Sequence, residues 1–345
     1  MKHFTGSFIV TILGLILAYF WGEHVLAGSG FICVFIAFVL SVLEVSLSFD
    51  NAVVNAMKLE TMTEVWKKRF ITWGIAIAVF GMRFLFPLLV VSIFAKLKIV
   101  EVLKIALTDS KLYALYLHQT HAPIVTFGGA FLIMLFLGYF LNPNKEVDWL
   151  PVEKIIKKVP NNKILDTLIA LFIVNAIHMV QPPPLRIKVL ISGLAGIVIY
   201  LLIDTISQKL ENFDEKRKKE CATAATWINC SSFVSFMYLE LIDASFSLDG
   251  VLGAFALSSD IVIITIGLAI GAMFVRSLTI LLVEEKTLAN YRFLEHGAHW
   301  AIGVLAVIMF LSTIMEIPEV VTGLSGLVII IASLISSIQF KKETA

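Results

Sequence analysis

Long runs of apolar residues, separated by short polar segments, make up most of this chain. A helix of about 20 apolar residues crosses the hydrocarbon core of a bilayer, which is roughly 30 Å thick. The pattern therefore predicts an all-α polytopic membrane protein with about ten transmembrane helices. We expect these helices at residues 6–23, 29–57, 70–95, 122–142, 163–181, 187–206, 223–257, 260–283, 299–315 and 318–338.

Composition and charge agree with a protein embedded in a lipid bilayer. Apolar residues make up 59% of the sequence and charged residues 15%, with a formal net charge of +1. A nucleic-acid partner is not expected, because DNA or RNA binding requires a concentrated basic surface. Most loop Lys and Arg residues fall on the side that holds the N-terminus, which predicts cytoplasmic termini. We expect the plasma or inner membrane and a retained first helix.

The second half of the sequence repeats features of the first half in the same order. The matching segments are 46–51 with 245–250, 73–84 with 266–277, and 121–136 with 296–311. If each half holds five helices, the second copy must enter the membrane with the opposite orientation. The sequence thus predicts two inverted repeats, at residues 1–182 and 183–345, an arrangement characteristic of secondary transporters.

Acidic residues recur inside the predicted spans of both copies, where a charge is energetically costly and marks a candidate functional site. They are Glu44, Asp50, Glu240, Asp243 and Asp249. The only cations that we assign to the spans are Arg83 and Arg276, as possible counter-ions. Two arginines cannot neutralise five carboxylates, so protons or a bound cation must supply the remaining positive charge.

The spacing of these residues favours an interrupted helix. Glu44 and Asp50 are six positions apart, or 240° around a regular helix, and therefore do not share a face. Local unwinding would bring both carboxylates and free carbonyl oxygens to one cavity. Carboxylate, carbonyl, hydroxyl and amide oxygens, including that of Asn51, suit magnesium, calcium or manganese.

These acidic motifs resemble those of the TerC-type family of membrane proteins, within the LysE-like exporter superfamily. The residues that carry the resemblance are Glu44, Asp50 and Asn51 in the first copy, and Glu240, Asp243, Asp249 and the later Arg276 in the second. The chain departs from the family pattern where Gly-Val-Leu-Gly follows Asp249, and at residues 143–188. The resemblance implies export of a divalent metal, chiefly Mn²⁺. It also implies a metal site formed by Glu44, Asp50, Asn51, Glu240, Asp243 and Asp249.

We therefore expect a secondary transporter that exports a divalent cation, with proton exchange as one way to drive it. The metal is its substrate, and no tightly bound cofactor is expected. Two alternatives stay open: a transporter of another small solute, and a membrane assembly partner that delivers metal to exported proteins. An enzyme is not expected, since HExxH and GxSxG motifs are absent from the sequence.

Overall fold

The computed structural model describes most of the chain as helices. The described ranges are residues 2–25, 27–60, 62–141, 148–156, 163–220, 260–284, 291–315 and 317–344, with scattered positions between 233 and 258. No strand occurs among these residues. In chain order the elements are η1 (Lys2–Phe4), α1 (Thr5–Val25), α2 (Gly30–Leu47), α3 (Phe49–Glu60), α4 (Glu64–Ala76), η2 (Ile77–Leu85), α5 (Phe86–Ala95), α6 (Ile99–Thr108), α7 (Ser110–Phe140), α8 (Pro151–Ile156), α9 (Lys163–Val180), α10 (Pro183–Glu220), α12 (Ile261–Glu284), α14 (Leu294–Ser312) and α15 (Glu319–Thr344).

Helices within the described ranges are long and apolar enough to cross a membrane at six places. These six segments are Thr5–Val25, Lys111–Phe140, Lys163–Val180, Pro183–Ile206, Ile261–Glu284 and Leu294–Ser312. Shorter apolar helices, at Gly30–Val45, Arg83–Ile93 and Leu324–Phe340, fall within three other expected spans. The remaining expected span, 223–257, lies mostly outside the described residues. The helices indicate a multi-pass membrane protein, with six of the ten expected spans meeting the length requirement.

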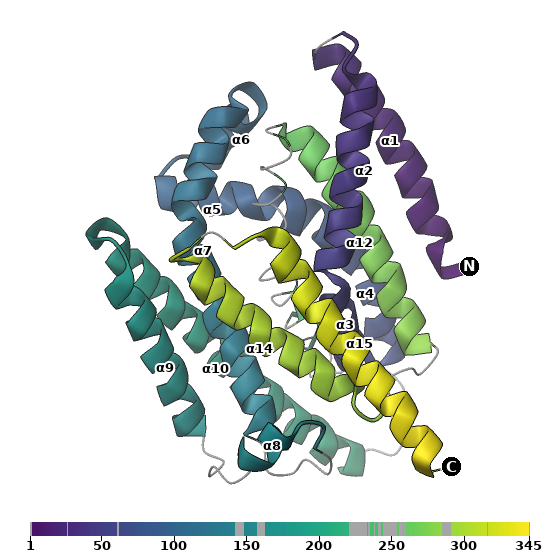
Figure 1. The fold of residues 1–345 in the computed structure, drawn as a ribbon, viewed down its shortest axis with the longest axis vertical. Coiled ribbons are helices and arrows are strands. Elements are labelled where there is room, and N and C mark those ends of the chain that lie inside the picture. Colours follow the sequence, from purple (N-terminus) through teal and green to yellow (C-terminus); the bar gives the residue numbers. More distant parts are fainter. Residues whose placement is uncertain are drawn as a thin grey trace.

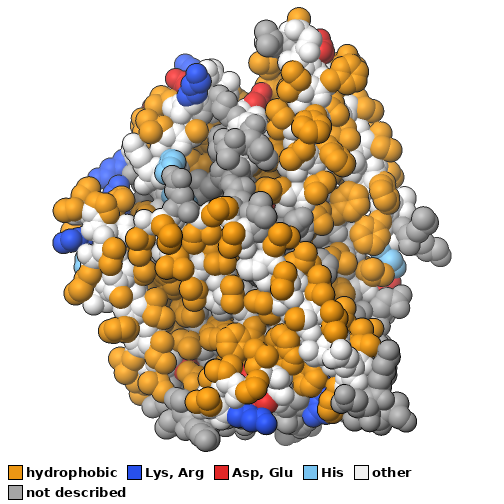
Figure 2. Space-filling model, viewed as in Figure 1, with side chains coloured by type: hydrophobic (Ala, Val, Ile, Leu, Met, Phe, Trp, Pro, Cys, Tyr) orange, Lys and Arg blue, Asp and Glu red, His pale blue; other side chains and the backbone are white. Residues whose placement is uncertain are grey.

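The surface agrees with this interpretation. Figure 2 shows hydrophobic side chains over most of the visible face, with the visible Lys, Arg, Asp and Glu side chains at its margins, including the lower end. Many large apolar side chains on α1, α9 and α10 are exposed, such as Phe20, Phe172 and Ile187. An apolar band between two polar ends is what contact with a lipid bilayer requires.

The helices form two groups that α14 and α15 join (Figure 1). On one side α1, α2 and α12 pack together, and on the other α7 packs against α9 and α10. The largest apolar core lies around α7 and α14 and includes Phe131, Met134, Ile302 and Met309. These two helices run in opposite directions, because Phe140 lies beside His296 while Phe136 lies beside Trp300.

α2 and α12 approach each other closely through two glycines. A Cβ added at Gly267 would lie 2.6 Å from the Cβ of Leu40, and one at Gly271 would lie 2.5 Å from the Cβ of Glu44. The residue numbers increase in the same direction along both helices at this contact, from Leu40 to Glu44 and from Gly267 to Gly271, so the two helices run parallel. Small residues spaced four apart allow such close packing between membrane helices. This contact brings Glu44 against the middle of α12.

The expected interruption near Glu44 is present, but it is milder than the unwinding that the spacing predicts. α2 ends at Leu47 and α3 begins at Phe49. However, the carbonyl oxygen of Glu44 still accepts a hydrogen bond from the Ser48 N–H at 2.9 Å, and that of Ser48 accepts one from Ala52 at 3.1 Å. The segment is therefore kinked, and these two carbonyl oxygens remain occupied by helical hydrogen bonds.

Two segments of unassigned role each include a short helix. Residues 98–118 contain α6 and the start of α7, and Val102 and Ala106 form the buried side of α6, as an amphipathic helix requires. Within residues 143–188, α8 carries the buried Glu153, which accepts hydrogen bonds from Trp300 Nε1 at 2.8 Å and lies 2.8 Å from His296 Nδ1. This carboxylate fastens α8 to the start of α14.

Candidate functional site

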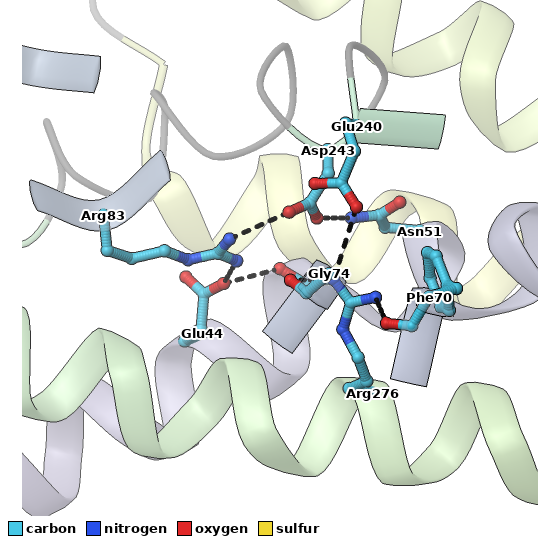
Figure 3. Close-up of polar contacts among 9 residues, drawn as sticks. Glu44, Asn51, Phe70, Gly74, Arg83, Glu240, Asp243 and Arg276 are labelled. Atoms are coloured by element: carbon cyan, nitrogen blue, oxygen red, sulfur yellow. Dashed lines mark hydrogen bonds and ion pairs between the residues drawn. The ribbon is translucent and has the colours of Figure 1, made fainter. Parts of the chain in front are cut away.

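Six of the eight residues predicted for the site lie together inside the fold (Figure 3). Four of them form two sequence-matched pairs, Glu44 with Asp243 and Arg83 with Arg276. Each pair has one member in each half of the chain. The six residues are Glu44, Asn51, Arg83, Glu240, Asp243 and Arg276. Asp50 is helical in α3, but its side chain lies outside the described part, as does the whole of Asp249. The structure therefore tests neither of these two predicted ligands.

Arg83, on η2, is the centre of the cluster. One terminal nitrogen of its guanidinium contacts Glu44 Oε1, and the other, Nη1, donates to Asp243 Oδ2 at 3.2 Å. The Arg83 and Glu44 side chains are each 2% exposed. Buried charges of this kind require partners, because removal from water without one is unfavourable by several kcal/mol. Arg83 thus joins a carboxylate of α2 to one from the second half of the chain.

Neutral side chains orient these carboxylates. Asn51 Nδ2 donates a 2.6 Å hydrogen bond to Asp243 Oδ1, and Ser48 Oγ donates a 3.0 Å bond to Glu44 Oε1. Ser48 lies between α2 and α3 and Asn51 lies in the first turn of α3, so the interruption of the helix directs polar side chains at the cluster. Asn51 was predicted as a ligand, and here it holds the carboxylate opposite Arg83.

Arg276 has a different environment from Arg83, although the two match in sequence. Its Nη1 donates to the carbonyl oxygen of Phe70 at 3.0 Å, and its Nη2 donates to that of Gly74. The guanidinium also lies 3.9 Å from the centre of the Phe70 ring, an interaction of a cation with an aromatic face. Its nearest approach to Glu240 is 3.8 Å. Arg276 is therefore held mainly by α4.

The family of the chain follows from a comparison with family models. The model described as "Protein of unknown function (DUF475)" matches residues 49–344. The chain belongs to the DUF475 family. No curated protein and no solved structure matches it. The matched region contains five of the six clustered residues, and only Glu44 precedes it.

Among the clustered carboxylates that the structure of this DUF475 protein describes, Glu240 has the fewest polar contacts. It is 4% exposed, and neither of its oxygens accepts a hydrogen bond within the described part of the chain. Asn55, on α3, is 5% exposed, and its Oδ1 likewise accepts no hydrogen bond within the described part of the chain. The sequence interpretation missed Asn55. Its position four residues after Asn51, hence on the same face of a helix, is the signal that could have identified it.

A small cavity of about 10 Å³ lies beside the cluster of the DUF475 protein. Its lining includes Asn55, Arg83, Asp243, Arg276 and Thr279. A cavity of this size is at the lower limit for one water molecule. The described residues also contain no group of three His, Cys, Asp or Glu side chains that could hold a metal ion. In this conformation the three predicted carboxylate ligands whose side chains are described, Glu44, Glu240 and Asp243, each lie within 4 Å of an arginine.

Proposed function

We propose that this protein is a secondary transporter that exports a divalent metal cation, with Mn²⁺ the best candidate, through the cluster around Arg83. The observation that carries the proposal is the meeting of Glu44 and Asp243 on one buried cationic group. These acidic residues occupy matching positions in the two sequence copies and are far apart in the chain. Intramembrane carboxylates that converge from two helices are typical of ion pathways.

The packing of the helices supports an inverted repeat. The two sequence-matched helices α7 and α14 lie side by side and antiparallel, as equivalent helices of oppositely inserted copies must. Reciprocal contacts are also present: Gly267 of the second copy approaches Leu40, while its match Gly74 would place a Cβ 2.9 Å from Glu240. Transporters built this way carry their substrate where the copies meet, and the cluster lies at such a junction.

The donor types support a hard divalent cation as the cargo. Glu44, Glu240, Asp243 and the amides of Asn51 and Asn55 provide oxygen atoms, which magnesium, calcium and manganese prefer. The preference for manganese comes from the resemblance of the acidic motifs to TerC-type proteins. Export, cytoplasmic termini and location in the plasma or inner membrane belong to the same proposal.

A flux measurement in proteoliposomes tests the proposal directly. Purified protein is reconstituted with a manganese-sensitive dye inside the vesicles, and the variants Glu44→Gln and Asp243→Asn are compared with the wild type. We expect each variant to reduce the rate of manganese entry by about tenfold or more, since each removes one anionic ligand. Asp50→Ala tests the predicted ligand whose side chain lies outside the described part.

Asp204→Asn provides a matched control. Asp204 lies on α10, where it pairs with Lys163 at 2.5 Å, well separated in sequence and fold from the cluster. Its replacement should leave flux unchanged. Undiminished flux in Glu44→Gln and Asp243→Asn would refute the site. Manganese binding without flux in wild-type vesicles would instead favour an assembly partner that delivers metal.

A further inference from the structure

Arg83 occupies the place between two carboxylates where a divalent cation would bind. We propose that Arg83 is an internal cation that takes the place of the metal when the transporter is empty, and that the metal binds by displacing it. This inference rests on the proposed transport function and adds a specific mechanism to it. The described contacts of the two arginines, and the helix that carries Arg83, support it.

The contacts of Arg83 exclude a metal at the same carboxylates. Its guanidinium uses Glu44 Oε1 and Asp243 Oδ2, and both carboxylates are buried. A divalent cation would need oxygens of these same two groups. A guanidinium bound to these oxygens competes with a metal ion for them, because two cations close together repel each other strongly where the surroundings are apolar. Occupation by Arg83 and occupation by metal are therefore alternatives.

Arg276 does not have this role, although it matches Arg83 in sequence. Two backbone carbonyls of α4 and the face of Phe70 hold its guanidinium. Those contacts do not depend on a carboxylate and would persist when a metal enters. Glu240, at 3.8 Å from Arg276 and without a hydrogen bond among the described residues, remains available as a further oxygen ligand. Only one of the two matched arginines is thus exchangeable.

The helix around Arg83 offers a way to move it. Residues Ile77–Leu85 form a π-helix between α4 and α5. Such segments are rare, are usually limited to one turn, and often occur at functional sites. A change of this segment from π-helical to α-helical hydrogen bonding would rotate Arg83 about the helix axis. That rotation withdraws the guanidinium from the carboxylates without breaking the helix.

The exchange explains how an empty carrier can change conformation. Two carboxylates left bare inside the protein would hold the site open to water, because buried charge without a partner is strongly unfavourable. Arg83 supplies positive charge as the metal leaves. This return step then requires no proton on Glu44 or Asp243.

Measurements of manganese binding to purified protein test the inference. We compare the wild type with Arg83→Gln, using Arg186→Gln as a matched control, since Arg186 is exposed and donates to the Gln181 carbonyl outside the cluster. Without its internal competitor, Arg83→Gln should bind Mn²⁺ about tenfold or more tightly, which corresponds to about 1.4 kcal/mol or more. It should also transport more slowly, because nothing displaces the metal. Arg186→Gln should match the wild type in both.

Chemical rescue keeps the test decisive if Arg83→Gln folds poorly. In Arg83→Ala, free guanidinium ion at millimolar concentration should compete with Mn²⁺, whereas the wild type should be insensitive to it. Unchanged or weaker manganese binding by folded Arg83→Gln would overturn this inference, as would absence of guanidinium competition in Arg83→Ala. Neither result would overturn the proposed transport function. Absence of manganese binding and flux in the wild type would instead overturn the proposed function.

Discussion

A methyl group added at Gly271 tests how closely α2 must lie against α12. The new Cβ would lie 2.5 Å from the Cβ of Glu44 and 2.8 Å from the carbonyl oxygen of Ser41, whereas ordinary contact begins at 3.4 Å. The helices must therefore separate by about 1 Å, since tightly packed interiors have no free space to absorb the difference. Overpacking of this kind costs about 1–3 kcal/mol. We expect Gly271→Ala to lower the free energy of unfolding by that amount.

Reversible unfolding in mixed micelles measures this change, and manganese flux provides a second readout. Flux should fall because displacement of Glu44 disturbs its contact with Arg83. Gly6→Ala is the matched control: Gly6 is helical, and an added Cβ there meets no atom within 4 Å. It should leave stability unchanged or raise it by up to about 1 kcal/mol. Equal stability of Gly271→Ala and Gly6→Ala would refute the close approach of the two helices.

Three further substitutions probe other buried polar contacts. Glu153→Gln should lower the free energy of unfolding by about 1–3 kcal/mol, because the charged partner of His296 and Trp300 is lost; an unchanged thermal midpoint in detergent would contradict this contact. Asp260→Ala should lower the free energy of unfolding by about 1 kcal/mol, because Asp260 Oδ1 accepts a hydrogen bond from the Val262 N–H at the start of α12. The same unfolding assay measures this change, and Asp260→Asn should retain most of the stability. Asn55→Leu should weaken manganese binding without loss of folded protein, as isothermal titration can measure, and unaltered affinity would exclude Asn55 as a ligand.

The apolar pattern predicts the helices well where a run is long and uninterrupted. The expected segments 6–23 and 163–181 correspond to α1 and α9 to within about two residues, since length and composition alone determine such helices. The prediction is less accurate where the chain bends. The expected span 70–95 comprises most of α4, all of η2 and all of α5. These divisions were not predicted, because nothing in the apolar pattern distinguishes π-helical from α-helical hydrogen bonding.

The gathering of Glu44, Glu240 and Asp243 also follows from the sequence, because the cost of burying charge in a membrane favours placing such groups beside partners. The two arginines predicted as possible counter-ions, Arg83 and Arg276, lie beside them. The partner of Glu153, in contrast, does not follow from the sequence. Glu153 and His296 are 143 positions apart, and no local pattern relates them. Asn55 was not predicted, because a single amide near the end of the expected span 29–57 is ordinary, although its spacing from Asn51 offered a signal. Pairs such as Glu153 and His296 become informative only when the tertiary contacts are known.

The different roles of Arg83 and Arg276 show why matched residues in two copies need not act alike. Gly74 allows the α4 backbone to approach Arg276, and a Cβ there would lie 2.5 Å from Arg276 Nη1. The matching Gly267 faces Leu40 of α2 instead. Arg276 therefore obtains backbone carbonyl partners, while Arg83 contacts carboxylates of both copies. A carboxylate can exchange one cation for another, whereas a backbone carbonyl carries no charge that must be balanced. In the exchange that we propose, this asymmetry makes Arg276 a fixed support and Arg83 the competitor of the cargo.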